Sequence, residues 1–421
     1  MQRSIFPRSA SLMSALVCVF AASVAWAGPK AYVGNFKDNT VSVIDTATAA
    51  VIVTIPVALG PHGMGVTPDG RTVYVSGDGG STVTAIDTAT DRVTGQIEVG
   101  KTPHGLAMQP DGKYFLVGVY GEDRVAWVDT ASGTVVDSVA VSKPHTIAIH
   151  PDGKTAWVSS QQPGKFALVV IDLAARKAVR SLPLEQPPRD LEFGFDGRAL
   201  YFTTAGSNAV RVLDPSTDKI IASVPTGVSP HLASVFRGAP AGLALVQGPG
   251  ELLLFDPATN APGQSIAVGK QPHWMAPYNR GLAVLVTNEG SDDVSLVDLA
   301  KRTSRTVPVG RAPRKVVVQP EAPADAANAQ PAAVPGGNKV SINNFAFQPA
   351  TLSVAVGDSV TWANDDGSPH GLQFKDGSQG KDLMLPKESF RRSFDQPGTY
   401  DYACSVHPYM SGAIVVRRRP S

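Results

Sequence analysis

The chain has 421 residues, of which 17% are charged and 43% hydrophobic, and its net charge is +1 at pH 7. This balance lacks the strongly basic character typical of nucleic-acid-binding proteins, so we expect no nucleic-acid partner. The length allows more than one domain.

The first 27 residues predict a secretory signal peptide. Arg3 and Arg8 give a positive start, residues 12–24 are apolar, and Ala25-Trp26-Ala27 is a small-x-small cleavage site. The apolar run is too short to span a bilayer comfortably and no second hydrophobic segment follows, so we expect no membrane span. We therefore expect an exported protein, periplasmic or secreted, that is cut after Ala27.

Residues 28–319 contain an internal repeat of seven copies. Its first marker is a Pro followed by His or Arg, and successive copies are separated by 42, 41, 44, 42, 42 and 41 residues. The copies are Pro61-His62, Pro103-His104, Pro144-His145, Pro188-Arg189, Pro230-His231, Pro272-His273 and Pro313-Arg314. Each unit holds four β-rich runs between Gly and Asp turns, so the sequence predicts an all-β fold with a seven-bladed β-propeller.

These repeats resemble the YVTN-type propellers. The resemblance is carried by Ala31-Tyr32-Val33-Gly34-Asn35, by Val41-Ser42-Val43-Ile44-Asp45-Thr46 and by the Pro-Asp-Gly turns. The array starts at what should be the second strand of a blade, residues 30–33, and ends with a first strand only, residues 314–319. We expect the two fragments to complete the seventh blade and so to remove open sheet edges.

Five of the eight His residues follow the repeated Pro. Because the innermost strand of each blade lines the channel, pseudo-symmetry predicts a ring of these side chains at one level of the axis. The ring comprises His62, His104, His145, His231 and His273, with Arg189 and Arg314 in the other two copies. It could hold a metal ion through imidazoles or an anion through the guanidinium groups. Two points argue against a metal. Duplication alone could have copied the His that follows the Pro, and a seven-fold ring is so wide that not all five His could reach one ion.

Residues 320–338 are rich in Pro and Ala and show no apolar periodicity. Such a composition is typical of a semi-extended interdomain linker. We therefore expect a second domain at residues 339–421.

The second domain carries Cys404, His407 and Met410 at C-x-x-H-x-x-M spacing, with His370 upstream. Type 1 copper uses two His and one Cys in a near-trigonal plane, with a weak axial Met. A thiolate, an imidazole and a thioether at this spacing can reach one ion from one tight loop. A buried structural thiol is the alternative for Cys404, but it does not account for the His and the Met.

The cysteine content limits the other metal centres. Only Cys18 and Cys404 are present, and Cys18 lies in the signal segment. A single remaining thiol excludes an internal disulfide, a binuclear copper bridged by two thiolates and a c-type haem attached through C-x-x-C-H.

The second domain resembles a cupredoxin of the amicyanin and pseudoazurin group. The resemblance implies a Greek-key β-sandwich, one type 1 copper ion, and His407 as an electron port rimmed by Pro408 and Tyr409. It departs from the family at Gly371, where relatives often carry a polar residue that hydrogen-bonds around the copper loop. The matching segments are Asn344-Phe345-Ala346-Phe347-Gln348-Pro349, Val356-Gly357-Asp358, Val360-Thr361-Trp362 and Phe394-Asp395-Gln396-Pro397-Gly398-Thr399-Tyr400.

Three functions fit these parts. The first is single-electron transfer with a redox partner protein, a cytochrome or a dehydrogenase or reductase, while the propeller acts as a docking or scaffold domain. The second is a self-sufficient oxidoreductase with a second metal or an anion in the propeller channel, in a domain order that is similar to nitrous oxide reductase. The third is a non-redox protein that stores or delivers copper. The sequence leaves open whether the chain is an enzyme, and no catalytic residue stands out.

Overall fold

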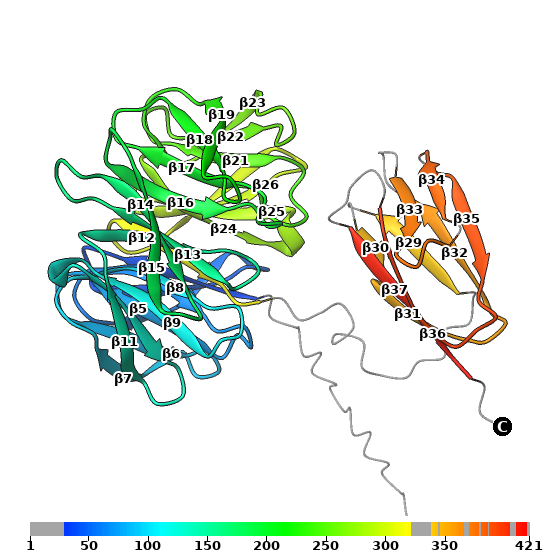
Figure 1. Ribbon diagram of the computed structural model, residues 1–421, viewed down its shortest axis with the longest axis horizontal. Helices are drawn as coiled ribbons and strands as arrows, with labels where there is room; N and C mark the ends of the chain where they lie inside the picture. The colour runs from blue at the N-terminus through cyan, green and yellow to red at the C-terminus, as the bar shows by residue number, and fades with distance from the viewer. Residues whose placement is uncertain are drawn as a thin grey trace, which may run out of the picture.

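The computed structural model describes residues 29–320, 338–343, 346–365, 370–378, 380–385, 387–404 and 410–418. In these ranges the chain forms seven four-stranded sheets followed by a two-sheet sandwich (Figure 1). This architecture confirms the predicted all-β fold, a seven-bladed propeller and a cupredoxin sandwich. The predicted signal peptide and residues 321–337 of the predicted linker lie outside the described residues.

Each blade is an antiparallel sheet whose strands follow one another from the channel outwards. The strands of the first four blades are β28 (Pro313–Val318), β1 (Lys30–Asn35), β2 (Thr40–Asp45) and β3 (Ala50–Pro56); β4 (Pro61–Val66), β5 (Thr72–Gly77), β6 (Thr82–Asp87) and β7 (Arg92–Glu98); β8 (Pro103–Met108), β9 (Tyr114–Val119), β10 (Arg124–Asp129) and β11 (Thr134–Ala140); β12 (Pro144–Ile149), β13 (Thr155–Ser160), β14 (Ala167–Asp172) and β15 (Lys177–Pro183).

The other three blades repeat the pattern, and two short 3-10 turns, η1 (Tyr120–Glu122) and η2 (Asn279–Gly281), lie between strands of the array. Their strands are β16 (Pro188–Phe193), β17 (Leu200–Thr204), β18 (Ala209–Asp214) and β19 (Lys219–Pro225); β20 (Pro230–Ser234), β21 (Gly242–Val246), β22 (Glu251–Phe255) and β23 (Pro262–Ala267); β24 (Pro272–Tyr278), β25 (Ala283–Asn288), β26 (Asp293–Asp298) and β27 (Thr303–Pro308).

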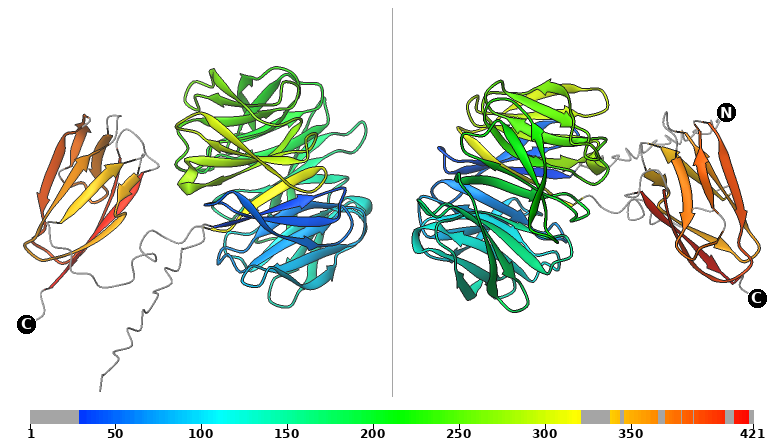
Figure 2. Two further views of the ribbon diagram at one scale, coloured as in Figure 1. Left: turned by 180° about the vertical axis from the view of Figure 1, so that it is seen from behind. Right: turned by 45° about the horizontal axis from the view of Figure 1, so that its top comes forward.

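The two ends of the array share one blade. β28 pairs antiparallel with β1, so that Val318 lies opposite Ala31 and Val316 opposite Val33. Figure 2 shows this yellow strand beside the blue beginning of the chain. The last strand of the array thus serves as the inner strand of the blade that the first strands begin, and pairing across this point joins the ring.

Apolar side chains fill the spaces between neighbouring blades. Tyr32 and Val43 of one blade pack in one cluster with Met64, Val73 and Val75 of the next. The outermost strands are largely exposed, as β3 and β7 illustrate. Burial of the inner strands on both faces is typical of sheets that are covered on each side, and it fixes the angle between blades.

Glycine allows the inner strands of two blades to approach their neighbours closely. A Cβ at Gly105 would lie 2.1 Å from the backbone oxygen of His145, and a Cβ at Gly63 would lie 2.2 Å from that of His104. No side chain tolerates such a contact with backbone. The histidines that precede these glycines are therefore brought close to each other around the axis.

The second domain consists of two packed sheets in the orders β30-β29-β32-β35 and β31-β37-β36-β33-β34. Its core is aromatic: the Trp362 ring lies 5.4 Å from that of Tyr402 and 5.8 Å from that of Phe374, both nearly edge to face. The strands are β29 (Lys339–Asn343), β30 (Ala346–Gln348), β31 (Thr351–Ala355), β32 (Ser359–Asn364), β33 (His370–Phe374), β34 (Lys381–Met384), β35 (Ser389–Ser393), β36 (Gly398–Ala403) and β37 (Ser411–Arg417).

Candidate metal centre and the channel histidines

Three of the four predicted copper ligands lie at strand ends of the sandwich. His370 begins β33, Cys404 directly follows β36, and Met410 directly precedes β37. All three belong to the buried interior, with exposed fractions of 0%, 2% and 3%. The Sγ atom of Cys404 lies 3.8 Å from Nδ1 of His370.

This spacing suits two ligands of one ion. Bonds of about 2.3 Å to sulfur and about 2.0 Å to nitrogen, at the roughly 120° angle of a trigonal plane, place the two ligand atoms about 3.7 Å apart. The observed 3.8 Å agrees with that value. A soft thiolate beside an imidazole, both removed from water, is also the donor set that copper prefers.

Backbone groups hold this arrangement. The Gly371 N–H donates a hydrogen bond of 3.3 Å to the Cys404 sulfur. The Cys404 N–H donates to the Met410 carbonyl at 2.9 Å, which ties together the two ends of the loop that the ligands flank. Gly371 therefore contributes a donor through its main chain, at the position where the sequence departs from the family pattern.

Sequence reasoning missed one supporting side chain. Asn364 is fully buried and donates through Nδ2 to the Met384 carbonyl at 3.0 Å. Met384 lies opposite His370 in the β33–β34 pair. Only its place at the end of an apolar strand could have signalled a role for Asn364. The fourth predicted ligand, His407, and its predicted neighbours Pro408 and Tyr409 lie outside the described residues.

In the propeller, the structure brings all five repeat histidines into one cluster. Ring centroids of His62 and His104 lie 3.8 Å apart, and those of His104 and His145 lie 4.2 Å apart. His273 lies 5.8 Å from His62 and 4.2 Å from His231. The channel at this level is thus narrow enough for the imidazoles to touch. We call these five residues the channel cluster.

Burial favours the neutral form of four imidazoles of the channel cluster. Desolvation lowers the pKa of His62, His104 and His273 well below the usual value, and repulsion between neighbouring imidazoles adds to the effect. The pKa of His145 is lowered for the same first reason. These rings are therefore uncharged at neutral pH.

The two arginines of the predicted ring make their contacts to one side of it. Arg314 forms an ion pair with Glu289 at 3.1 Å and stacks on Phe36. Arg189 donates to Ser229 at 3.1 Å and to the side-chain oxygen of Gln247 at 3.4 Å. None of these contacts joins a guanidinium group to an imidazole.

Sequence reasoning missed a buried carboxylate at the cluster. Asp190 accepts a hydrogen bond from Thr146 at 2.7 Å, and its other oxygen lies 2.6 Å from Nδ1 of His231. Burial alone would raise the pKa of Asp190, but the adjacent His231 holds it well below its usual range. The signal was available, because Asp190 is the one acidic residue at the second position after the repeated Pro.

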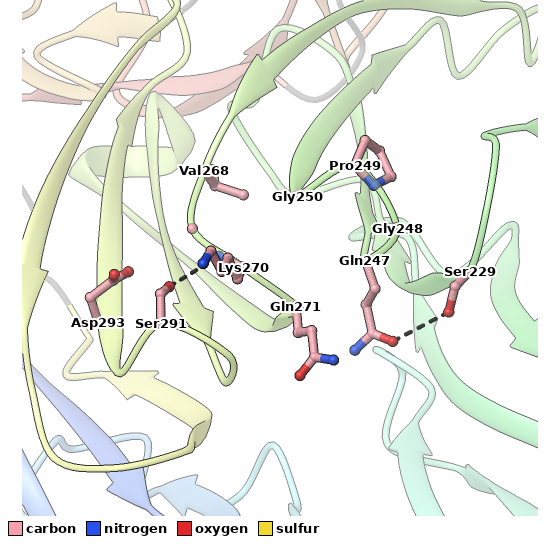
Figure 3. Close-up of a pocket in the computed structure, with 11 residues that line it drawn as sticks. Ser229, Gln247, Gly248, Pro249, Gly250, Val268, Lys270, Gln271, Ser291 and Asp293 are labelled. Atoms are coloured by element: carbon pink, nitrogen blue, oxygen red, sulfur yellow. Dashed lines mark hydrogen bonds between the residues drawn. The ribbon is translucent and has the colours of Figure 1, made fainter.

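A pocket of about 700 Å³ lies between the blades of β20–β23 and β24–β27. Figure 3 shows Gln247 and Gln271 directing their amides toward each other there, while Ser229 bonds Gln247. Two of the residues that line it, Ser229 and Gln247, are the partners of Arg189.

No group of three His, Cys, Asp or Glu side chains among the described residues already surrounds a common point as metal ligands would. In the channel cluster, the centroids of neighbouring rings lie 3.8 to 4.2 Å apart and the rings are tilted by 34° to 44°.

Comparison with protein families finds one match in each of the two parts of the chain. Residues 335–417 match the family described as copper binding proteins, plastocyanin/azurin family, and residues 19–111 match a YNCE-like beta-propeller. Amicyanin-alpha of Methylorubrum extorquens is 37% identical over 86 residues, which are 19% of this chain and 72% of that protein. Amicyanin of Paracoccus denitrificans is 34% identical over 107 residues, 24% of this chain and 79% of the relative.

Solved structures resemble the propeller in fold. A chain of Kuenenia stuttgartiensis hydrazine synthase matches with a TM-score of 0.59 and 19% identity, over 68% of this chain and 99% of that chain. The dihydro-heme d1 dehydrogenase NirN matches with a TM-score of 0.53 and 20% identity, over 68% and 74% respectively. At these identities the likeness concerns the fold alone.

Proposed function

Because this chain belongs, through residues 335–417, to the plastocyanin/azurin family of copper-binding proteins, we propose that it transfers single electrons at one type 1 copper. The ligands in this proposal are His370, Cys404, His407 and Met410. One observation carries it: the buried Sγ of Cys404 lies 3.8 Å from the buried Nδ1 of His370, with Met410 at the other end of the loop. His407 enters through the spacing of the motif alone.

Copper, when bound here, supplies a one-electron couple between Cu(I) and Cu(II). Cys404 must lose its proton to act as a ligand. The Gly371 N–H, which points at the sulfur, stabilises the resulting negative charge. Burial of Cys404 and His370 excludes water from both donor atoms and so favours a fixed geometry in both oxidation states.

Four protein ligands would leave no position for a substrate or for release of the metal to a partner. That is why electron transfer is a better proposal than catalysis at this centre or copper delivery. The amicyanins and plastocyanins that match this domain support the same choice.

Location and partner are part of the proposal. The signal-like first 27 residues support export to the periplasm. No helix in the described part of the chain has the length and apolar character to cross a membrane. We propose a soluble redox protein, a cytochrome or a dehydrogenase or reductase, as the electron partner, and the propeller as the domain that docks it.

The test is Cys404→Ser, with Met384→Leu as its matched control. Cys404→Ser should abolish the intense visible absorption of a copper–thiolate bond and lower the bound copper, while the propeller stays folded. Met384→Leu alters a buried sulfur residue opposite His370 that is not a proposed ligand, so it should keep the absorption. If Cys404→Ser protein keeps its absorption, the assignment is wrong.

A further inference from the structure

Two histidines of the channel cluster donate from Nδ1 to the backbone of the next blade. Nδ1 of His104 lies 3.2 Å from the carbonyl oxygen of His145, and Nδ1 of His273 lies 3.1 Å from that of Arg314. A carbonyl oxygen only accepts, so each Nδ1 must carry the hydrogen. In a neutral imidazole the other nitrogen, Nε2, then holds a lone pair.

A third histidine of the cluster reaches the same state through Asp190. Thr146 gives its hydroxyl hydrogen to Asp190 at 2.7 Å, so its oxygen accepts from Nδ1 of His145 at 3.0 Å. Nε2 of His145 is likewise the nitrogen left without this hydrogen. The second oxygen of Asp190 lies 2.6 Å from Nδ1 of His231, but this contact lacks the geometry of a hydrogen bond and does not fix the tautomer of His231.

A carboxylate also faces one of these nitrogens. Oε2 of Glu289 lies 3.8 Å from Nε2 of His273, beyond the length of a hydrogen bond. A lone pair and a carboxylate that face each other at this distance repel unless a cation lies between them. Arg314 neutralises the other oxygen of Glu289, which leaves Oε2 directed at the cluster.

We propose that the channel cluster binds one transition-metal ion of the class that prefers imidazole nitrogen, Cu(II) or Zn(II), through Nε2 atoms. The Nδ1 bonds to carbonyl and hydroxyl oxygens are outer contacts of the kind that fix metal-binding histidines in one tautomer and raise their basicity. Neutral imidazoles bind without losing a proton first, and burial supplies that neutrality.

The arrangement of the rings shows what binding requires. Neighbouring imidazoles lie 3.8 to 4.2 Å apart at their centroids and are tilted by 34° to 44°, so they must turn about their side-chain bonds before their Nε2 atoms converge on one point.

An anion is a poorer occupant. Lone pairs at Nε2 repel an anion, and the two guanidinium groups of this level already have partners in Glu289 and in Ser229 with Gln247. A wet channel without a ligand would not explain why the Nδ1 atoms of His104, His145 and His273 all have oxygen partners.

This site goes beyond the proposed electron transfer and does not depend on it. The experiment uses the mature full chain without a histidine tag, loaded with Cu(II) or Zn(II) and freed of loosely held metal by gel filtration. We expect one tightly bound ion beyond the copper of the sandwich. His104→Gln combined with His273→Gln should lose that ion and keep the visible copper–thiolate absorption.

The matched control is His150→Gln. His150 lies outside the channel cluster, where it contacts Asp152 and the carbonyl oxygen of Gly197, so its replacement should leave metal content unchanged. Far-ultraviolet circular dichroism checks that each variant is folded. If the double variant does not fold, the metal content of the wild-type protein decides. A wild-type protein that binds no ion beyond the sandwich copper, whether loaded with Cu(II) or with Zn(II), overturns the proposal. Retention of the extra ion by a folded double variant overturns it equally. Loss of the visible absorption in wild type would instead count against the copper centre alone.

Discussion

Asp190→Asn tests whether the channel cluster is held together by one buried carboxylate. Asp190 is only 4% exposed; one of its oxygens accepts from the Thr146 hydroxyl at 2.7 Å, and the other lies 2.6 Å from Nδ1 of His231. Asn has the same shape but offers one oxygen, so its amide NH₂ must face either the Thr146 hydroxyl or Nδ1 of His231. One buried donor is then left without a partner.

The expected loss of folding free energy follows from this one unsatisfied donor. An unsatisfied buried donor destabilises a protein by about 1–3 kcal/mol. For a domain of this size each kcal/mol lowers Tm by roughly 2–4 °C, so a loss of about 2 kcal/mol lowers the Tm of the propeller by about 4–8 °C. Because Asp190 has a pKa held below its usual range, its contribution is present above the unfolded value of about 4 and is lost as the pH falls through the lower folded value. The difference between wild type and variant should therefore persist at pH 5 and shrink only below about pH 4.

Differential scanning calorimetry measures this effect, since it can resolve the propeller transition from that of the sandwich. Asp111→Asn is the control, because Asp111 is an exposed turn residue that accepts one hydrogen bond from the Lys113 N–H, which Asn can also accept. Its Tm should stay close to that of wild type. If Asp190→Asn also matches wild type at pH 7, the carboxylate does not stabilise the cluster and the reasoning fails.

Two other substitutions probe the channel. Gly105→Ala places a Cβ 2.1 Å from the His145 backbone oxygen, so this buried overpacking should lower propeller stability by about 3 kcal/mol or more. The control is Gly95→Ala, which should not lower stability because nothing lies within 4 Å of its Cβ. Equal urea midpoints for the two variants would contradict the close approach of the inner strands. Burial raises the pKa of Glu192 to about 7, so the folded state binds its proton more tightly than the unfolded state does, and this group makes stability decline as the pH rises from about 4.3 to about 7. Glu192→Gln should remove that part of the decline, and urea unfolding at several pH values that shows the same slope in both proteins would refute the assignment.

The repeat made the propeller predictable. A Pro-His or Pro-Arg pair every 41 to 44 residues, with four β-rich runs per unit, is a local pattern that needs no knowledge of distant contacts. The incomplete ends of the array likewise suggested the pairing that β28 and β1 make. Blade packing follows because alternating apolar residues can be buried only between neighbouring sheets.

The candidate copper site came from a local motif as well. Cys404 and Met410 are close in the sequence; the structure buries both, and it places the Cys404 sulfur 3.8 Å from Nδ1 of His370. The Gly371 N–H bond to sulfur could not be read from residue type, because the group belongs to the main chain. The position of His407 stays a prediction from the motif.

The sequence by itself determined the number of blades and the repeat position of the five histidines, because each depends on residues close together in the chain; the donor set of the sandwich stays a prediction from the motif. Only the tertiary structure decided that the imidazoles touch, that Asp190 accepts from Thr146 and lies against His231, and that Arg314 pairs with Glu289. These contacts join residues from different blades, and their distances depend on how tightly the inner strands pack around the axis. That packing is set by small features such as Gly63 and Gly105, whose effect appears only when neighbouring blades are in place.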